Sequence, residues 1–265
     1  MKKRILLAVV VLLAAAASAN AEEGKLSGTI DVTYVSSYIW RGFDVYGPGG
    51  HSAIQPSINV DLYGTGFGTK VWMSRANSSG YEDGERWDYT LYYYNKLFDD
   101  EAYATNYTVS WVYYSYPDSS KHTYDLQEAN LILSWPKIFP GGLVPGYILI
   151  HLWPSSSNSN VSQAVGWAHI FTLDYPWAVP GFMPDTIKQI LNLHAELVYN
   201  DGADPRANGT GVDHDWSNAV FGVSTDFSIT KDLSFTPGLY YQVSMDDSVN
   251  DDDETWVSMS MKYKF

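Results

Sequence analysis

The sequence has 265 residues, 30 of them acidic and 16 basic, which gives a formal net charge of −14 at pH 7. This charge argues against nucleic acid as a partner, because proteins bind nucleic acid mainly through lysine and arginine. The chain contains no cysteine, which excludes a disulfide framework and cysteine-ligated metal sites. Aromatic residues supply 15% of the chain, an excess typical of the aromatic belts at membrane interfaces.

The first residues have the pattern of a secretory signal peptide. Lys2, Lys3 and Arg4 precede an apolar run over residues 5–17, and the small residues Ala19 and Ala21 then form a cleavage pattern. We therefore expect residues 1–21 to be a signal peptide and residues 22–265 to be a single exported domain. No later segment reaches the roughly 18 consecutive apolar residues of a transmembrane helix.

Most of the remaining chain alternates between apolar and polar residues with a period of two, which predicts β-strands that are apolar on one face. A soluble sandwich would show the same alternation. We favour an all-β transmembrane antiparallel up-and-down β-barrel of about twelve strands, whose strands need about ten residues to cross a bilayer. The segment 188–200 also fits a helical face, but its two-fold alternation is cleaner. The predicted strands cover residues 26–42, 54–62, 67–75, 87–94, 107–113, 129–135, 147–153, 167–175, 191–200, 219–229, 233–243 and 256–265.

The connections between the predicted strands alternate in length, as those of bacterial barrels do. Residues 64–66, 99–100 and 230–232 form very short turns, whereas residues 201–215 and 246–254 form long polar loops. The proline-rich links at 136–145 and 176–185 are exceptions. The pattern places both chain ends in the periplasm and the long loops outside the cell.

Two segments resemble known outer-membrane proteins. The last strand ends in Phe265, which resembles the C-terminal signal that the barrel-assembly machinery reads. Ser36, Tyr38, Arg41 and Gly42 resemble a Ser-x-Tyr-x-x-Arg-Gly element of the TorF family of porin-like proteins, and Ser37 also precedes the tyrosine. The resemblance implies a pore-like barrel in the bacterial outer membrane, in contact with lipid and lipopolysaccharide.

Charged residues opposite the apolar faces are candidates for a hydrated interior, because a dry core could not hold so many charges. The early cations Arg41, Lys70 and Arg86 would face acidic residues and create a transverse field, as charged rings do in pores. Internal salt bridges that close a narrow barrel are the alternative. The predicted pore-lining residues are Asp31, Arg41, Asp61, Lys70, Arg86, Asp88, Glu128, His194, Glu196 and Asp226.

The sequence predicts a narrow passive channel for small polar or ionic solutes, with a preference for cations and without a cofactor, metal site or catalytic residue. One alternative is a lipid-modifying barrel enzyme that uses His194 and Glu196 as a general-base or metal pair. The chain lacks a His-x-Ser pair, which would place a serine nucleophile beside its base on one strand face. Another alternative is a non-conducting barrel that docks a periplasmic partner through residues 136–145 and 176–187.

Overall fold

The computed structural model describes residues 25–47, 51–78, 80–81, 84–119, 122–157, 159–182, 187–206 and 211–265. The predicted signal peptide, residues 1–21, lies outside these residues. No helix within them is long and apolar enough to span a membrane.

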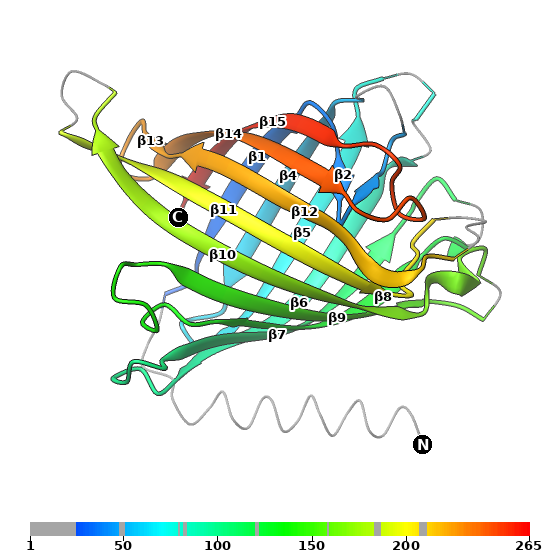
Figure 1. Ribbon diagram of the computed structural model, residues 1–265, viewed down its shortest axis with the longest axis horizontal. Helices are drawn as coiled ribbons and strands as arrows, with labels where there is room; N and C mark the ends of the chain where they lie inside the picture. Colours follow the sequence, from blue (N-terminus) through cyan, green and yellow to red (C-terminus); the bar gives the residue numbers. More distant parts are fainter. Residues whose placement is uncertain are drawn as a thin grey trace.

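The chain forms a closed barrel of twelve antiparallel strands (Figure 1). Each strand pairs with its neighbours in sequence, and β1 closes the barrel by pairing with β15. A break at Asp226 separates β12 from its short continuation β13 (Phe227–Ser228). The barrel strands are β1 (Ser27–Val35), β4 (Ala53–Asp61), β5 (Phe67–Ala76), β6 (Arg86–Leu97), β7 (Thr105–Ser115), β8 (Leu126–Ser134), β9 (Val144–Pro154), β10 (Gly166–Pro180), β11 (Lys188–Asp201), β12 (His214–Thr225), β14 (Leu233–Ser244) and β15 (Glu254–Lys264).

The outer face of the barrel is apolar, and the predicted alternation is confirmed. Large apolar side chains point outward and stay exposed, whereas the residues between them face the interior. This arrangement suits a barrel whose outer band contacts lipid. Exposed apolar residues on the outer face include Ile30, Val32, Leu91, Val109, Phe221, Leu239 and Met259.

The connections at the two ends of the barrel differ in length. The terminal end, where β1 begins and β15 ends, carries the shorter connections 62–66, 98–104, 181–187 and 226–232, together with 135–143, which is as long as 77–85 at the opposite end. The opposite end, here called the loop end, carries the longer connections, including 36–52 between β1 and β4 and 202–213 between β11 and β12. The predicted alternation in length is therefore present.

The prediction that residues 176–185 form a long proline-rich link is wrong, because part of this segment is a strand. The segment from Pro176 to Pro180 belongs to β10, where Pro176 pairs with Asn192 of β11. Pairing of β10 with β9 stops at Asp174, so the later part of β10 is an edge. Proline is tolerated there because an edge strand can leave one row of N–H positions unused. The helical alternative for residues 188–200 is also wrong, since this segment forms β11.

The largest departure from the prediction concerns the first strand. We predicted one strand through Gly42, but β1 ends at Val35 and the following residues fold into the barrel. They form a small hairpin of β2 (Ile39–Trp40) and β3 (Phe43–Asp44). We call residues 36–47 the inner hairpin. A 3-10 turn, η3 (Ser162–Ala164), packs with other loop residues above it at the loop end.

Candidate functional site

The inner hairpin turns at Arg41 and Gly42. Both residues have positive φ angles, 54° and 95°, which close the two-residue turn between Trp40 and Phe43. The departure from β1 begins at Ser36, whose hydroxyl accepts a hydrogen bond of 3.0 Å from the backbone N–H of Val257 in β15. The chain therefore leaves the barrel wall at Ser36, whose hydroxyl still accepts a hydrogen bond from the neighbouring strand β15.

The tip of the inner hairpin is anchored to two separate parts of the barrel. The guanidinium of Arg41 donates two hydrogen bonds to the carboxylate of Glu128 in β8, at 2.5 and 2.8 Å. The carbonyl oxygen of Gly42 accepts hydrogen bonds from Gln242 in β14, at 3.0 Å, and from Asn250, at 3.2 Å. Because β8 and β14 lie far apart around the barrel, the hairpin crosses the interior and narrows it.

A second arginine supports the base of the inner hairpin. The guanidinium of Arg86 in β6 lies 4.2 Å from the ring centroid of Trp40, 4.8 Å from that of Tyr114 and 5.6 Å from that of Tyr38. Its Nε lies 2.8 Å from a carboxylate oxygen of Asp88. Cation–π contacts of this kind gain strength when the cation is desolvated. Arg86 therefore holds two hairpin aromatics against the barrel wall.

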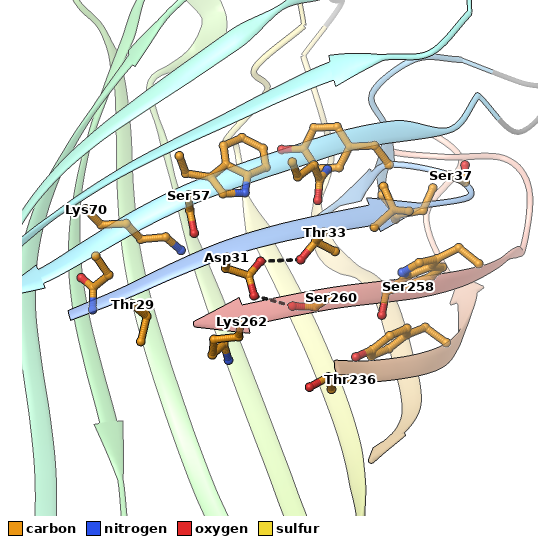
Figure 2. Close-up of a pocket in the computed structure, with 18 of the residues that line it drawn as sticks. Thr29, Asp31, Thr33, Ser37, Ser57, Lys70, Thr236, Ser258, Ser260 and Lys262 are labelled. Carbon is orange, nitrogen blue, oxygen red and sulfur yellow. Dashed lines mark hydrogen bonds between the residues drawn. The ribbon is translucent and has the colours of Figure 1, made fainter. Parts of the chain in front are cut away.

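A polar cavity of about 780 Å³ lies on the terminal side of the inner hairpin, and we call it the terminal cavity (Figure 2). Hydroxyl and amide groups from β1, β4 and β15 line it, together with Asp31, Lys70 and Lys262. The carboxylate of Asp31 accepts hydrogen bonds from Thr33, at 2.6 Å, and from Ser260. These groups make this part of the interior suitable for water and small polar solutes.

A second cavity, of about 610 Å³, opens at the loop end and is lined by aromatic residues, Arg86 and Arg206. Asp44 of the hairpin also lines it. Burial, together with the negative charge of Glu254, raises the pKa of Asp44 to about 6. Asp44 is therefore a carboxylate whose charge the local structure disfavours.

A third cavity, of about 390 Å³, lies between the inner hairpin and the walls formed by β8 to β14, and we call it the middle cavity. Its lining combines the hairpin tip, His194 and Glu196 of β11, and several isoleucines. The Nδ1 of His194 lies 2.7 Å from a carboxylate oxygen of Asp174, and its Nε2 lies 3.9 Å from Glu196. Within the described ranges, no three metal-ligating side chains form a group that could hold an ion.

Six of the predicted pore-lining residues are found beside the three cavities. Asp31 and Lys70 line the terminal cavity, and Arg86 lines the loop-end cavity. Arg41, His194 and Glu196 line the middle cavity.

Arg41 and the four remaining predicted residues have structural partners. Arg41 lies at the hairpin tip beside the middle cavity, and not on a strand wall as we predicted, and its partner is Glu128. Asp88 pairs with Arg86 on the same strand face. Asp61 accepts a hydrogen bond of 2.6 Å from the N–H of Gly64 in the 62–66 turn, and Asp226 accepts one from Thr236.

These partners change the expected electrostatics of the interior. Two of the three early cations, Arg41 and Arg86, are paired with carboxylates, so their charges are locally compensated. The interior thus contains internal ion pairs around the inner hairpin and, on the terminal side, a cavity lined in part by charged residues.

Sequence reasoning missed the aromatic groups that hold the hairpin and the amides that receive its tip. The alternation places Trp40 in a strand, and it does not distinguish Gln242 and Asn218, both fully buried, from other polar strand residues. One signal was available. The alternation of β1 stops at the two consecutive serines Ser36 and Ser37, which a continuous membrane strand would not need.

Comparison with solved structures places this fold among outer-membrane β-barrels. The NanC porin matches with a TM-score of 0.52 and 12% identity, covering 90% of this chain and 100% of that one. An outer-membrane channel from Pseudomonas putida F1 matches with a TM-score of 0.53 and 12% identity over 93% and 98% of the two chains. The KdgM porin matches with a TM-score of 0.50 and 11% identity over 90% and 99%.

Sequence comparisons add nothing to this assignment. No protein-family model matches the chain, and no curated protein matches it. The class of the protein therefore rests on its fold, a porin-like barrel of twelve strands, and the resemblance to the TorF family rests on the residues that carry it.

Proposed function

We propose that this protein is an outer-membrane channel for the passive diffusion of small polar or ionic solutes, narrowed by the inner hairpin. The observation that carries the proposal is the terminal cavity, in which Asp31, Lys70 and Lys262 lie inside a barrel with an apolar outer face. Charged groups without ion-pair partners in the described structure are stable inside a protein only where water reaches them.

The proposed orientation places the terminal end in the periplasm and the longer loops outside the cell. The alternating lengths of the connections support this orientation. The exposed apolar band would contact outer-membrane lipid, and the outer loops would contact lipopolysaccharide. We assign β15, with Phe265 beyond it, to recognition by the barrel-assembly machinery, on the basis of its resemblance to the C-terminal signal of such barrels.

The proposal includes a modest preference for cations. The net negative charge of the chain and the carboxylates of Asp174 and Glu196 in β10 and β11 support it. Lys70 and Lys262 in the terminal cavity oppose it, so we expect a weak selectivity.

No catalytic step is assigned to the chain. Among the described residues, the polar partners of His194 are the carboxylates of Asp174 and Glu196, and no serine hydroxyl hydrogen-bonds to it. A serine nucleophile would need its base within hydrogen-bond reach.

One observation bears on the docking alternative. The hairpin of β10 and β11 extends beyond its neighbours at the terminal end (Figure 1), and the edge of β10 after Asp174 has no partner strand among the described residues. Pro176 and Pro180 lack an N–H, however, and proline on an edge hinders pairing with another strand. This geometry favours a channel over a barrel that docks a partner through this edge.

The test is single-channel recording with the refolded mature protein in a planar bilayer under a salt gradient. Discrete conductance steps with a small reversal potential of the sign for cations are the expected result. Absence of conductance from a barrel that shows heat-modifiable migration would overturn the channel assignment. A reversal potential of the opposite sign would overturn the cation preference alone.

A further inference from the structure

The middle cavity has an aliphatic wall where a water-filled channel would have polar side chains. Ile150 and Ile170 pack in a buried cluster and are 1% and 4% exposed. Ile132, in contrast, is 37% exposed inside the barrel, and Ile148 is half-buried beside it. Packing against neighbouring residues therefore accounts for Ile150 and Ile170, but it does not account for the apolar side chains of Ile132 and Ile148. The aliphatic residues that line the cavity are Ile132, Ile148, Ile150, Ile170 and Val220.

Buried hydrogen-bond acceptors without donors also line the middle cavity. Gln242 is fully buried, and its Nε2 donates to the carbonyl oxygen of Gly42. That contact fixes the orientation of the amide, because a carbonyl cannot donate to the amide oxygen. The Oε1 of Gln242 and the Oδ1 of Asn130 have no hydrogen-bond partner in the described part of the chain. Buried acceptors left unsatisfied cost free energy, so a donor-bearing ligand would stabilise this cavity.

The charge of the middle cavity is negative in every protonation state of its histidine. Asp174 and Glu196 are two carboxylates around one imidazole, that of His194, which carries at most one positive charge. The remaining cation, Arg41, is neutralised by its two hydrogen bonds to Glu128. An anion would therefore be repelled from this cavity.

Aromatic faces are also available to a cation. The rings of Tyr240 and Trp256 stack with centroids 5.4 Å apart and an interplanar angle of 12°, and both residues line the cavity. Tryptophan and tyrosine faces attract ammonium groups through their quadrupoles.

We infer that the middle cavity binds a small amphipathic cation, an organic ammonium compound with an aliphatic or aromatic body. A primary ammonium group has three donors and no acceptor. It can pair with Glu196 and donate to one of the two unsatisfied acceptors, the Oε1 of Gln242 in β14 or the Oδ1 of Asn130 in β8, while its body packs on the isoleucine wall. This inference rests on the proposed channel, since it names a class of solute for that interior.

Other solute classes fit the same walls less well. A carboxylate would face Glu196 across the cavity. A sugar would place hydroxyl groups against the isoleucines and leave them unpaired, which is unfavourable. The chemistry of the lining therefore selects the ammonium group together with the apolar body.

The experiment is ligand-observed NMR on the refolded barrel in detergent micelles, with empty micelles as the blank. The probes are butylammonium, butan-1-ol and butanoate, which share the chain and differ in the head group. We expect butylammonium to bind about tenfold or more tightly than the other two, because a hydrogen bond to a charged group adds more affinity than a neutral one. Equal binding of the three probes, or no binding of butylammonium, would overturn the inference.

Two variants test the two halves of the site, and one serves as a control. Glu196→Gln removes the carboxylate and should weaken butylammonium about tenfold, whereas Ile148→Thr should weaken it about threefold by making the wall polar. Asp99→Asn removes one negative charge from the exposed 98–104 turn and should leave binding unchanged. Unchanged binding in both test variants would contradict the site.

The readout separates this inference from the proposed function, because NMR binding does not depend on ion flow. A conducting barrel that does not bind butylammonium would overturn the inference alone. A barrel that binds butylammonium but does not conduct would overturn the channel and leave the site.

Discussion

Arg41 and Glu128 form a two-point ion pair, with nitrogen–oxygen distances of 2.5 and 2.8 Å, that joins the inner hairpin to β8. The Glu128 side chain is 1% exposed and that of Arg41 is 19% exposed. A planar guanidinium held at two points on a carboxylate has a defined orientation as well as a favourable energy. The pair therefore fixes the position of the hairpin tip inside the barrel.

Removing one partner of this pair should loosen the inner hairpin. Arg41→Met or Glu128→Leu leaves the other charge without its counter-ion, at a cost of a few kcal/mol. That cost is below the roughly 3–5 kcal/mol of a fully buried pair, because Arg41 keeps 19% exposure. We expect larger and noisier single-channel conductance and a lower thermal transition of the folded barrel in each single variant.

The double variant Arg41→Met/Glu128→Leu is the control for this prediction. It removes both charges, so it should recover much of the lost stability while keeping the raised conductance. Conductance equal to that of the unmodified protein in all three variants would show that the pair does not position the hairpin.

Gly42→Ala should displace the hairpin tip without changing any charge. A Cβ at this position would lie 2.7 Å from the Oδ1 of Asn218 and from a methyl carbon of Val249, and the φ angle is 95°. Gly142→Ala is the matched control, because Gly142 has a φ of 81° with no atom within 4 Å of its added Cβ. Both variants carry the left-handed strain of about 1–2 kcal/mol, but Gly42→Ala alone should raise the conductance. Equal conductance in the two variants would contradict close packing at the tip.

The inner hairpin should be packed more firmly at pH 5 than at pH 7.5. Burial and Glu254 raise the pKa of Asp44 to about 6, above the value of roughly 3.9 in an unfolded chain. The folded state therefore binds more protons, and stability falls as the pH rises from about 4 to about 6. Current noise through the open channel, recorded at the two pH values, should be higher at pH 7.5.

Asp44→Asn should abolish this pH dependence, whereas Asp99→Asn in the exposed 98–104 turn should retain it. Glu254 and His51 are the other titratable groups that influence Asp44. A pH dependence that persists unchanged in Asp44→Asn would assign it to one of them and refute the prediction.

The barrel could be predicted from the sequence because its alternation is local and repeated. Ile30, Val32 and Met259 point outward. The period-two pattern within each strand is sufficient to predict this face, because it does not depend on which residues the neighbouring strands pair with. The ion pair of Arg86 with Asp88 also follows from spacing, since residues two apart on a strand share a face.

The inner hairpin could not be predicted in the same way. Residues 36–42 have an alternation that is compatible with a strand. The contact that holds them inside the barrel is the one between Arg41 and Glu128, which lies 87 positions after Arg41 in the sequence. The contact between His194 and Asp174 likewise depends on the register of β10 with β11, which pairs these two residues directly. Tertiary packing decides which residues form such contacts, so they cannot be predicted from the local periodicity of the sequence.

The seam of the barrel depends on an aromatic ring lying over a glycine. Phe265 and Gly28 exchange two backbone hydrogen bonds of 3.0 Å, and a Cβ on Gly28 would lie 2.7 Å from the Phe265 ring and 2.3 Å from the carbonyl oxygen of Asn59. Gly28→Ala should therefore destabilise the refolded barrel by about 1–3 kcal/mol, as overpacking does, measured as the urea midpoint of heat-modifiable migration. Gly141→Ala, whose added Cβ meets no atom within 4 Å, is the control and should behave like the unmodified protein.

Phe265→Ala removes the ring that covers the glycine and should lower the same midpoint by a smaller amount, because both backbone hydrogen bonds remain. An unchanged midpoint in both Gly28→Ala and Phe265→Ala would mean that the seam is held by the β1–β15 ladder alone.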